Sequence, residues 1–272
     1  MIERENANRL YDIYAKLPAP IRRAGLALIP RSFRARVRYW AKGEAKIIDA
    51  EILRLDGTPW HMFRSGLSTA GTTERVVEYP WTLSRFAGER RVLDAGTANA
   101  FPAYVRALRG LRIPELHGVD LLPATLEGFT MTQADIRQMP FADGFFDLIF
   151  CISTLEHIGL DSSRQGIESN LDVQGDVLAL REMRRVLRDG GHALVTVPFG
   201  RPQEYAWFRQ YDLASWKETV GRAGLAPVEV AFYGYSPQGW TPYADGQALE
   251  STDYRARGAQ AAGAVLCSVL RR

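Results

Sequence analysis

Two aspartates stand where their carboxylates could bind a nucleoside. Asp94 follows an apolar pair, and Asp120 ends the predicted strand 113–119. A carboxylate at the tip of a second strand can accept hydrogen bonds from both hydroxyls of a ribose. An acid placed directly before a turn also suits a cationic ligand. The spacing therefore predicts a nucleoside site built on acidic residues.

The residues after Asp94 form a turn of small side chains that leads into a helix. Gly96 and Ala98 leave the backbone accessible, and Pro102 suits the first turn of a helix. Turns of this kind open nucleotide-binding α/β units, because their backbone N–H groups face the ligand. The dinucleotide-binding fingerprint needs three glycines, and this chain has Ala98 and Phe101 at two of those positions. A ligand without a pyrophosphate is therefore favoured.

A histidine follows a predicted buried strand at 145–153. His157 comes just beyond the tip of that strand, at the crevice edge where open α/β sheets bind ligands. Its ordinary pKa suits a general base at neutral pH, although the same residue could begin a helix and bond the backbone. With Glu156 and Asp161 it also offers the nitrogen and oxygen ligands that divalent ions accept. The sequence is compatible with each of these roles.

The segment 92–96, Val-Leu-Asp-Ala-Gly, resembles the first motif of class I S-adenosylmethionine-dependent methyltransferases. That motif continues with two further glycines, where this chain has Ala98 and Ala100. The likeness extends in the same order over residues 75–235. It implies S-adenosyl-L-methionine as the cofactor and methyl transfer as the reaction.

The resemblance also gives roles to individual positions. Asp120 would hold the ribose and Asp135 the adenine amino group, with Ile136 beside the ring. His157 is the predicted catalytic residue, as a base or as a contact to the acceptor. The predicted cofactor-binding residues are Asp94, Ala95, Gly96, Thr97, Asp120, Leu121, Asp135, Ile136 and Ser153. Ser153 replaces the first glutamate of the Glu…Glu-His arrangement of ubiquinone-pathway O-methyltransferases, so no metal site is predicted.

The alternation of strands and helices predicts the fold. We expect a Rossmann-like, doubly wound α/β sheet of seven strands whose last strand is antiparallel. Residues 1–75 should form a basic helical extension that packs on the core, and residues 76–272 the methyltransferase domain. The expected helices are 7–16, 21–40, 44–55, 102–108, 177–188 and one capped by Asp212, and the expected strands after the first motif are 113–119, 145–153, a strand from His192 to Phe199, 227–235 and 264–270.

Charge is spread unevenly along the 272 residues. The net charge is only +3, yet Lys16 to Gly43 contains eight basic residues and no acid. Arginines interleaved with apolar side chains fit contact with an anionic membrane surface, or a helical cap with a solvated basic face. No nucleic-acid partner is expected. No apolar stretch approaches the roughly 20 residues that span a bilayer, and Cys151 and Cys267 are expected to be buried thiols, so a cytoplasmic protein is predicted.

The predicted reaction is methyl transfer to a hydroxyl of a sugar or polysaccharide-pathway intermediate, or of another small molecule. Loops 154–176 and 236–260 should bind this acceptor. Arg75 and Glu78 should either meet a ligand or form a surface ion pair. One alternative is an NAD(P)-dependent oxidoreductase, although no tyrosine is followed four residues later by the lysine that short-chain dehydrogenases use. Another is a methyltransferase-like binding module that has lost the chemistry.

Overall fold

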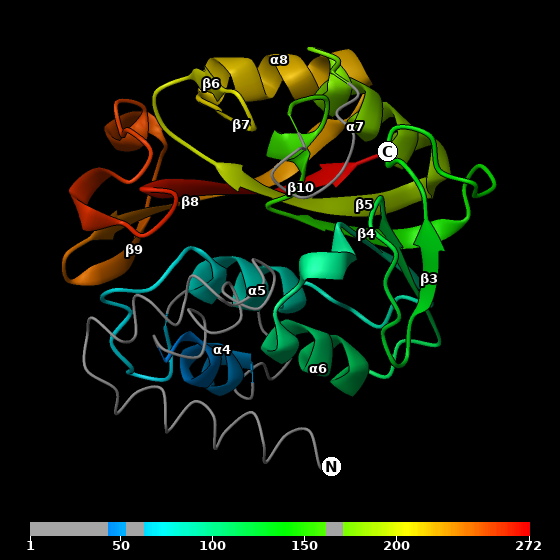
Figure 1. The fold of residues 1–272 in the computed structure, drawn as a ribbon, viewed down its shortest axis with the longest axis horizontal. Coiled ribbons are helices and arrows are strands. Elements are labelled where there is room, and N and C mark those ends of the chain that lie inside the picture. Colours follow the sequence, from blue (N-terminus) through cyan, green and yellow to red (C-terminus); the bar gives the residue numbers. More distant parts are fainter. Residues whose placement is uncertain (1–42, 53–62, 162–170) are drawn as a thin grey trace, which may run out of the picture.

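The computed structural model describes residues 43–52, 63–161 and 171–272, and within these ranges one eight-stranded sheet organises the chain (Figure 1). The strand order is β3-β2-β1-β4-β5-β10-β8-β9. The strands are β1 (Arg91–Ala95), β2 (Glu115–Asp120), β3 (Thr130–Gln133), β4 (Phe146–Ile152), β5 (Leu187–Pro198), β8 (Ala226–Ser236), β9 (Gly239–Tyr243) and β10 (Ala264–Arg271).

The strands from β3 to β5 in this order are parallel to their neighbours. The last strand of the chain, β10, runs antiparallel between β5 and β8. The predicted Rossmann-like sheet with an antiparallel last strand is therefore confirmed. An eighth strand, β9, pairs with β8 and lies inside the predicted loop 236–260. The carboxyl ends of the parallel strands meet at one edge of the sheet, which is where such folds bind ligands.

Helices cover both faces of the sheet. The helices α4 (Glu44–Ile52), α5 (Arg75–Leu83) and α6 (Pro102–Gly110) lie on one face, and α7 (Gly175–Val186) and α8 (Leu213–Ala223) on the other (Figure 1). Successive side chains of a strand point to opposite faces. Val92 of β1 accordingly belongs to the core under the first group, whereas Leu93 belongs to the core under the second. Burial on both faces explains why consecutive residues of the motif strand, Val92 and Leu93, are both apolar.

Several predicted boundaries shift by a few residues. The helix predicted at 177–188 spans Gly175–Val186, because Leu187 is fully buried and pairs with Phe146 at the start of β5. The helix predicted to end at 108 continues to Gly110. The Asp212 cap is confirmed, since its carboxylate accepts a hydrogen bond from the Ser215 N–H at 2.8 Å.

Three short strands are absent from the sequence-based expectation. They are β3 and the hairpin formed by β6 (Gln203–Tyr205) and β7 (Phe208–Gln210). Such strands of three or four residues are too short to show a clear alternation of apolar and polar side chains. The hairpin follows β5 and returns over the carboxyl edge of the sheet, so it becomes part of the candidate site.

Some predictions lie outside the described residues. These are the helices at 7–16 and 21–40, the basic stretch 16–43 and the middle of the loop 154–176. The described helix α4 packs against α5 and α6. Within the described ranges, no helix is long and apolar enough to cross a membrane. Both cysteines are buried and unpaired, as expected.

Candidate functional site

The turn after β1 brings bare backbone against the residue that follows β4. Gly96 has a φ of 87°, in the left-handed region that glycine tolerates. A Cβ at this position would lie 2.2 Å from Oγ1 of Thr154, so only a hydrogen fits. The hydroxyl of Thr97 donates to the carbonyl oxygen of Asp94 at 2.6 Å and closes the turn. The tips of β1 and β4 are thereby held together.

Asp120 is fixed by backbone N–H groups at the end of β2. Its Oδ2 accepts from Ala98 N–H at 2.9 Å, and its Oδ1 accepts from Leu122 N–H at 2.9 Å. Each carboxylate oxygen keeps a second lone pair for another donor. Leu121, beside it, is 38% exposed. The carboxylate is thus oriented in advance next to the turn.

Asp135 is held by its own neighbour, Arg137. The Arg137 Nε lies 3.0 Å from both carboxylate oxygens, Nη2 lies 2.6 Å from Oδ2, and the Arg137 N–H donates to Oδ1 at 2.9 Å. Partial burial opposes ionisation, but these hydrogen bonds outweigh it and hold the pKa of Asp135 below its usual range. Ile136, which lies between these two residues in the sequence, is buried. A ligand amino group would share this carboxylate with a guanidinium.

Asp94 supports the turn from beneath. It is 3% exposed, and the Tyr104 hydroxyl of α6 donates to its Oδ1 at 2.8 Å. Burial raises the pKa of Asp94 to about 7, against the lowering effect of hydrogen bonds from Tyr104 and Thr97. Ala95 is also buried. The motif acid therefore joins β1 to α6.

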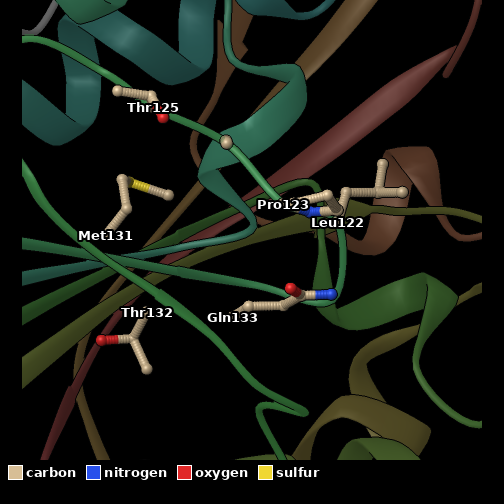
Figure 2. Close-up of a pocket in the computed structure, with 7 residues that line it drawn as sticks. Leu122, Pro123, Thr125, Met131, Thr132 and Gln133 are labelled. Atoms are coloured by element: carbon tan, nitrogen blue, oxygen red, sulfur yellow. The ribbon is translucent and has the colours of Figure 1, made fainter.

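A hollow of about 310 Å³ lies between the loop after β2 and the edge strand β3. Figure 2 shows its lining, which comes from the loop after β2 and from the edge strand β3. Within it Gln133 reaches toward Leu122 and donates from Nε2 to the carbonyl oxygen of Leu121 at 3.0 Å. The hollow is lined by Leu122, Pro123, Ala124, Thr125, Met131, Thr132 and Gln133. It begins two residues beyond Asp120.

The tip of β4 carries a backbone outlier. Ser153 has a φ of 41°, which is uncommon for a residue with a side chain. Its hydroxyl donates to Oε1 of Glu78 at 2.7 Å, and the Thr196 hydroxyl donates to the same oxygen at 2.9 Å. Glu78 is fully buried and also pairs with Arg75. The predicted ion pair of Arg75 and Glu78 is confirmed, but a surface location is wrong for its carboxylate, because α5 buries it against β4 and β5.

Two more buried glutamates surround Arg75. Glu74 is 8% exposed and Glu156 is 3% exposed. Burial, opposed by Arg75, raises the pKa of Glu74 to about 7. Burial raises the pKa of Glu156 to about 8, and the charge of Glu78 adds to the rise. The Oε2 atom of each has no hydrogen-bond partner. A buried carboxylate oxygen without a hydrogen-bond partner is costly, which marks this cluster as a functional candidate.

His157 is oriented by a backbone carbonyl. Its Nδ1 lies 2.7 Å from the carbonyl oxygen of Trp207, and its ring stacks on the Trp207 ring at 5.4 Å between centroids. Since a carbonyl only accepts, we assign the proton to Nδ1, which leaves a lone pair on Nε2. That nitrogen is 3.8 Å from Oε1 of Glu156. Burial holds the pKa of His157 below its ordinary value, so the ring is neutral at neutral pH.

Aromatic side chains from distant segments form a wall next to His157. The Phe208 ring lies 4.3 Å from that of Tyr205, 4.6 Å from Trp207 and 4.4 Å from Tyr254, measured between centroids. We call Tyr205, Trp207, Phe208 and Tyr254 the aromatic wall. The hairpin that supplies three of them is anchored by Arg209, whose Nη1 lies 2.8 Å from Asp176 of α7.

The structure thus brings the predicted residues together in two groups at one sheet edge. One group surrounds the turn after β1 and Asp120, and the other surrounds Ser153 and His157. Sequence reasoning missed Glu74 and the aromatic wall. The dense aromatics at 205–211 were the available signal for the wall. Among the described residues, no three His, Cys, Asp or Glu side chains converge as a metal site.

Comparisons with known proteins agree with this geometry. Residues 93–195 match the family described as "Methyltransferase domain". A candidate methyltransferase of Encephalitozoon cuniculi is 29% identical over 133 residues, which cover 47% of this chain and 51% of that protein. The chain therefore matches about half the length of this curated relative.

Solved structures with similar folds were also found. A Burkholderia thailandensis 1,6-didemethyltoxoflavin-N1-methyltransferase, solved with S-adenosylhomocysteine, is 14% identical, with a TM-score of 0.49 over 94% of this chain and 91% of that one. The YcgJ protein of Bacillus subtilis is 18% identical, with a TM-score of 0.47 over 72% of this chain and 98% of that one.

Proposed function

We propose a function from one premise: this chain belongs to the class I S-adenosylmethionine-dependent methyltransferases. Its proposed activity is transfer of a methyl group from S-adenosyl-L-methionine to a small-molecule acceptor. The methylated atom is proposed to be a hydroxyl oxygen, on a sugar or polysaccharide-pathway intermediate in the first instance.

The residues around the turn after β1 fit this donor. Gly96 has no room for a side chain, so the backbone of the turn stays bare at the sheet edge. Asp120 has both oxygens oriented and spare lone pairs, as a ribose diol requires. Asp135 and Ile136 would meet the adenine, while Ala95, Thr97, Leu121 and Ser153 would line the remaining contact. When bound, the donor supplies an electrophilic methyl group.

The observation that carries the proposal is the His157 geometry. A hydroxyl nucleophile has to lose its proton as the new bond forms, and a positioned base assists that loss. The Trp207 carbonyl holds the Nδ1 proton, and Nε2 keeps its lone pair. Burial lowers the pKa of His157, so the ring is unprotonated at neutral pH and Nε2 is available to accept a proton. His157 is therefore proposed to accept the acceptor proton at Nε2.

The acceptor would lie between the aromatic wall and the described parts of the loop 154–176, which are residues 154–161 and 171–176. Positioning the nucleophile in line with the methyl group supplies much of the catalysis in such displacements. The hairpin of β6 and β7 covers the short helix Leu155–His157, since Asp161 N–H donates to the Ala206 carbonyl oxygen at 2.9 Å. This cover would exclude water from the reacting groups.

Isothermal titration of the full chain tests the proposal against its alternatives. S-adenosylhomocysteine should bind and NAD should not. Binding of NAD alone would indicate an oxidoreductase. A module that had lost its cofactor should bind neither ligand. Transfer of labelled methyl to small hydroxyl compounds, with the product analysed by mass spectrometry, would then identify the methylated oxygen.

A further inference from the structure

Two carboxylate oxygens beside the proposed base have no partner in the structure. They are Oε2 of Glu74, at the N-terminal end of α5, and Oε2 of Glu156, in the short helix after β4. Both side chains are at least nine-tenths buried. Native proteins pair almost all buried polar atoms, so an orphan of this kind calls for a missing donor.

The positive charge already present does not satisfy this pair. Arg75 contacts Glu78 directly and lies 3.5 Å from Oε1 of Glu74. Glu78 is further supplied by the hydroxyls of Ser153 and Thr196. Among the described residues of this cluster, three glutamates therefore surround one guanidinium. Burial raises the pKa of Glu156 to about 8, so without a ligand this side chain holds a proton at neutral pH, and a second cation would balance the charge once it ionises.

The surface facing these acids suits a cation that carries apolar groups. Burial raises the pKa of the Tyr254 hydroxyl, and the nearby charges of Glu74 and Glu156 add to the rise. Trp207 stacks on His157, the neighbour of Glu156. Aromatic faces attract ammonium groups and pack against the carbon atoms that bear them. Buried carboxylates next to aromatic rings form a site that suits an amine.

We propose that Glu74 and Glu156 form an ammonium-binding site, and that the ammonium group belongs to the methyl acceptor. The acceptor is then a hydroxyl compound that also carries a protonated amine. This inference rests on the proposed function, and it adds the chemical class of the substrate.

One other molecule could supply an ammonium group, namely the amino-acid tail of the donor. The aromatic wall favours the acceptor, because a stack of four rings offers more apolar contact than an amino-acid α-carbon needs. Glu156 also lies 3.8 Å from Nε2 of His157, whose Nδ1 is hydrogen-bonded to the Trp207 carbonyl oxygen of the hairpin. The experiment therefore has to distinguish these two sources.

The test uses two probes of one shape, benzylamine and benzyl alcohol, titrated into the full chain with and without saturating S-adenosylhomocysteine. The variants are Glu156→Gln and Glu74→Gln, which keep shape and remove charge. Glu115→Gln is the matched control, since Glu115 pairs with Arg90 and Arg91 at the opposite end of β2. Melting temperatures confirm that each variant is folded.

We expect benzylamine to bind at least tenfold more tightly than benzyl alcohol, and each Gln variant at the site to lose that preference. The control should keep it, and S-adenosylhomocysteine affinity should be unchanged in all variants. Because an arriving ammonium lowers the raised pKa of Glu156, binding at pH 7 should also release protons, seen as a dependence of the heat on the buffer.

Two results would overturn the inference. If Glu156→Gln weakens S-adenosylhomocysteine about tenfold while benzylamine shows no preference, the ammonium group is the donor's own. If neither variant changes the affinity for benzylamine or for S-adenosylhomocysteine, Glu74 and Glu156 bind no ammonium group. If the wild type fails to bind S-adenosylhomocysteine at all, the proposed function fails, whereas benzylamine binding without it still tests the site.

Discussion

Around the turn after β1, both oxygens of Asp120 accept from backbone N–H groups, whereas around the short helix Leu155–His157 the Oε2 atoms of Glu74 and Glu156 accept from nothing. The first region is complete before any ligand arrives. The second carries two buried acids with raised pKa values and unpaired Oε2 atoms, and a serine with a left-handed backbone. Asp94 in the first region also has a raised pKa, but its Oδ1 accepts from the Tyr104 hydroxyl.

This contrast fits a division of labour between binding and chemistry. A preorganised carboxylate binds a ligand without further ordering, so it contributes affinity. Strained backbone and perturbed pKa values cluster where reacting groups are handled. Four predictions separate the two regions, from the largest expected effect to the smallest.

The largest effect, on turnover, is expected from loss of the proposed base beside the short helix Leu155–His157. His157→Ala should lower kcat by roughly 10²–10⁴, the usual range for removal of a general base. S-adenosylhomocysteine affinity, measured by titration, should barely change. A variant that keeps near-full turnover would make His157 structural. Restoration of chelator-treated enzyme by a divalent ion would make it a metal ligand instead.

A change at Asp120, beside the turn after β1, should alter the affinity for S-adenosylhomocysteine. Asp120→Ala removes hydrogen bonds to a charged group, worth roughly 1.5–3 kcal/mol. Affinity for S-adenosylhomocysteine should therefore fall about tenfold or more. Asp143→Ala is a suitable control, because Asp143 is an exposed carboxylate paired with Arg185. Equal affinity in folded Asp120→Ala would place the nucleoside elsewhere.

The contact between the two regions, Gly96 against Thr154, should contribute to the free energy of unfolding. Gly96→Ala forces a Cβ against Thr154 and a side chain into a left-handed backbone, at a cost of about 1–3 kcal/mol in the free energy of unfolding. Thr154→Ala should recover part of that loss in the double variant, because it removes the Oγ1 and Cγ2 atoms that clash. Urea denaturation of the four proteins measures the coupling. Purely additive changes would contradict the packing described.

The buried acids should make stability depend on pH. The pKa of Glu156 is about 8 in the folded protein and lies near 4.5 when exposed, so between these values the folded state holds a proton that the unfolded state has lost. Its contribution to stability is therefore full at low pH and is lost as pH rises through about 8. Between pH 6.5 and 9, Glu156→Gln should show a shallower fall in the free energy of unfolding than the wild type. Parallel curves would mean that Glu156 is already ionised.

His157 acts in the opposite direction at lower pH. Its depressed pKa means that the unfolded state takes up a proton first, so its contribution is lost as pH falls below about 6.5. Measurements above that pH keep the two effects apart.

The motif side of the site could be predicted from local sequence. An apolar pair, an acid, a glycine turn and a proline helix start are consecutive, and their roles depend on local backbone geometry. The same holds for Asp120, whose place at the end of β2 follows from the predicted strand 113–119. Because the strands are parallel, their carboxyl ends then lie at the same edge of the sheet.

The chemistry side depended on contacts between residues far apart in the sequence. Glu78 meets Ser153 and Thr196 only because α5 packs across β4 and β5, and no local pattern encodes that distance. Likewise Tyr254 joins the aromatic wall from a segment that follows β9. The sequence by itself determined the central strands of the sheet and the turn after β1, because the period of apolar residues and the chemistry of turns are local, whereas β3 and β9 were not predicted. Only the tertiary structure decided which glutamates became buried without partners, since burial and pKa depend on every segment that packs around a group.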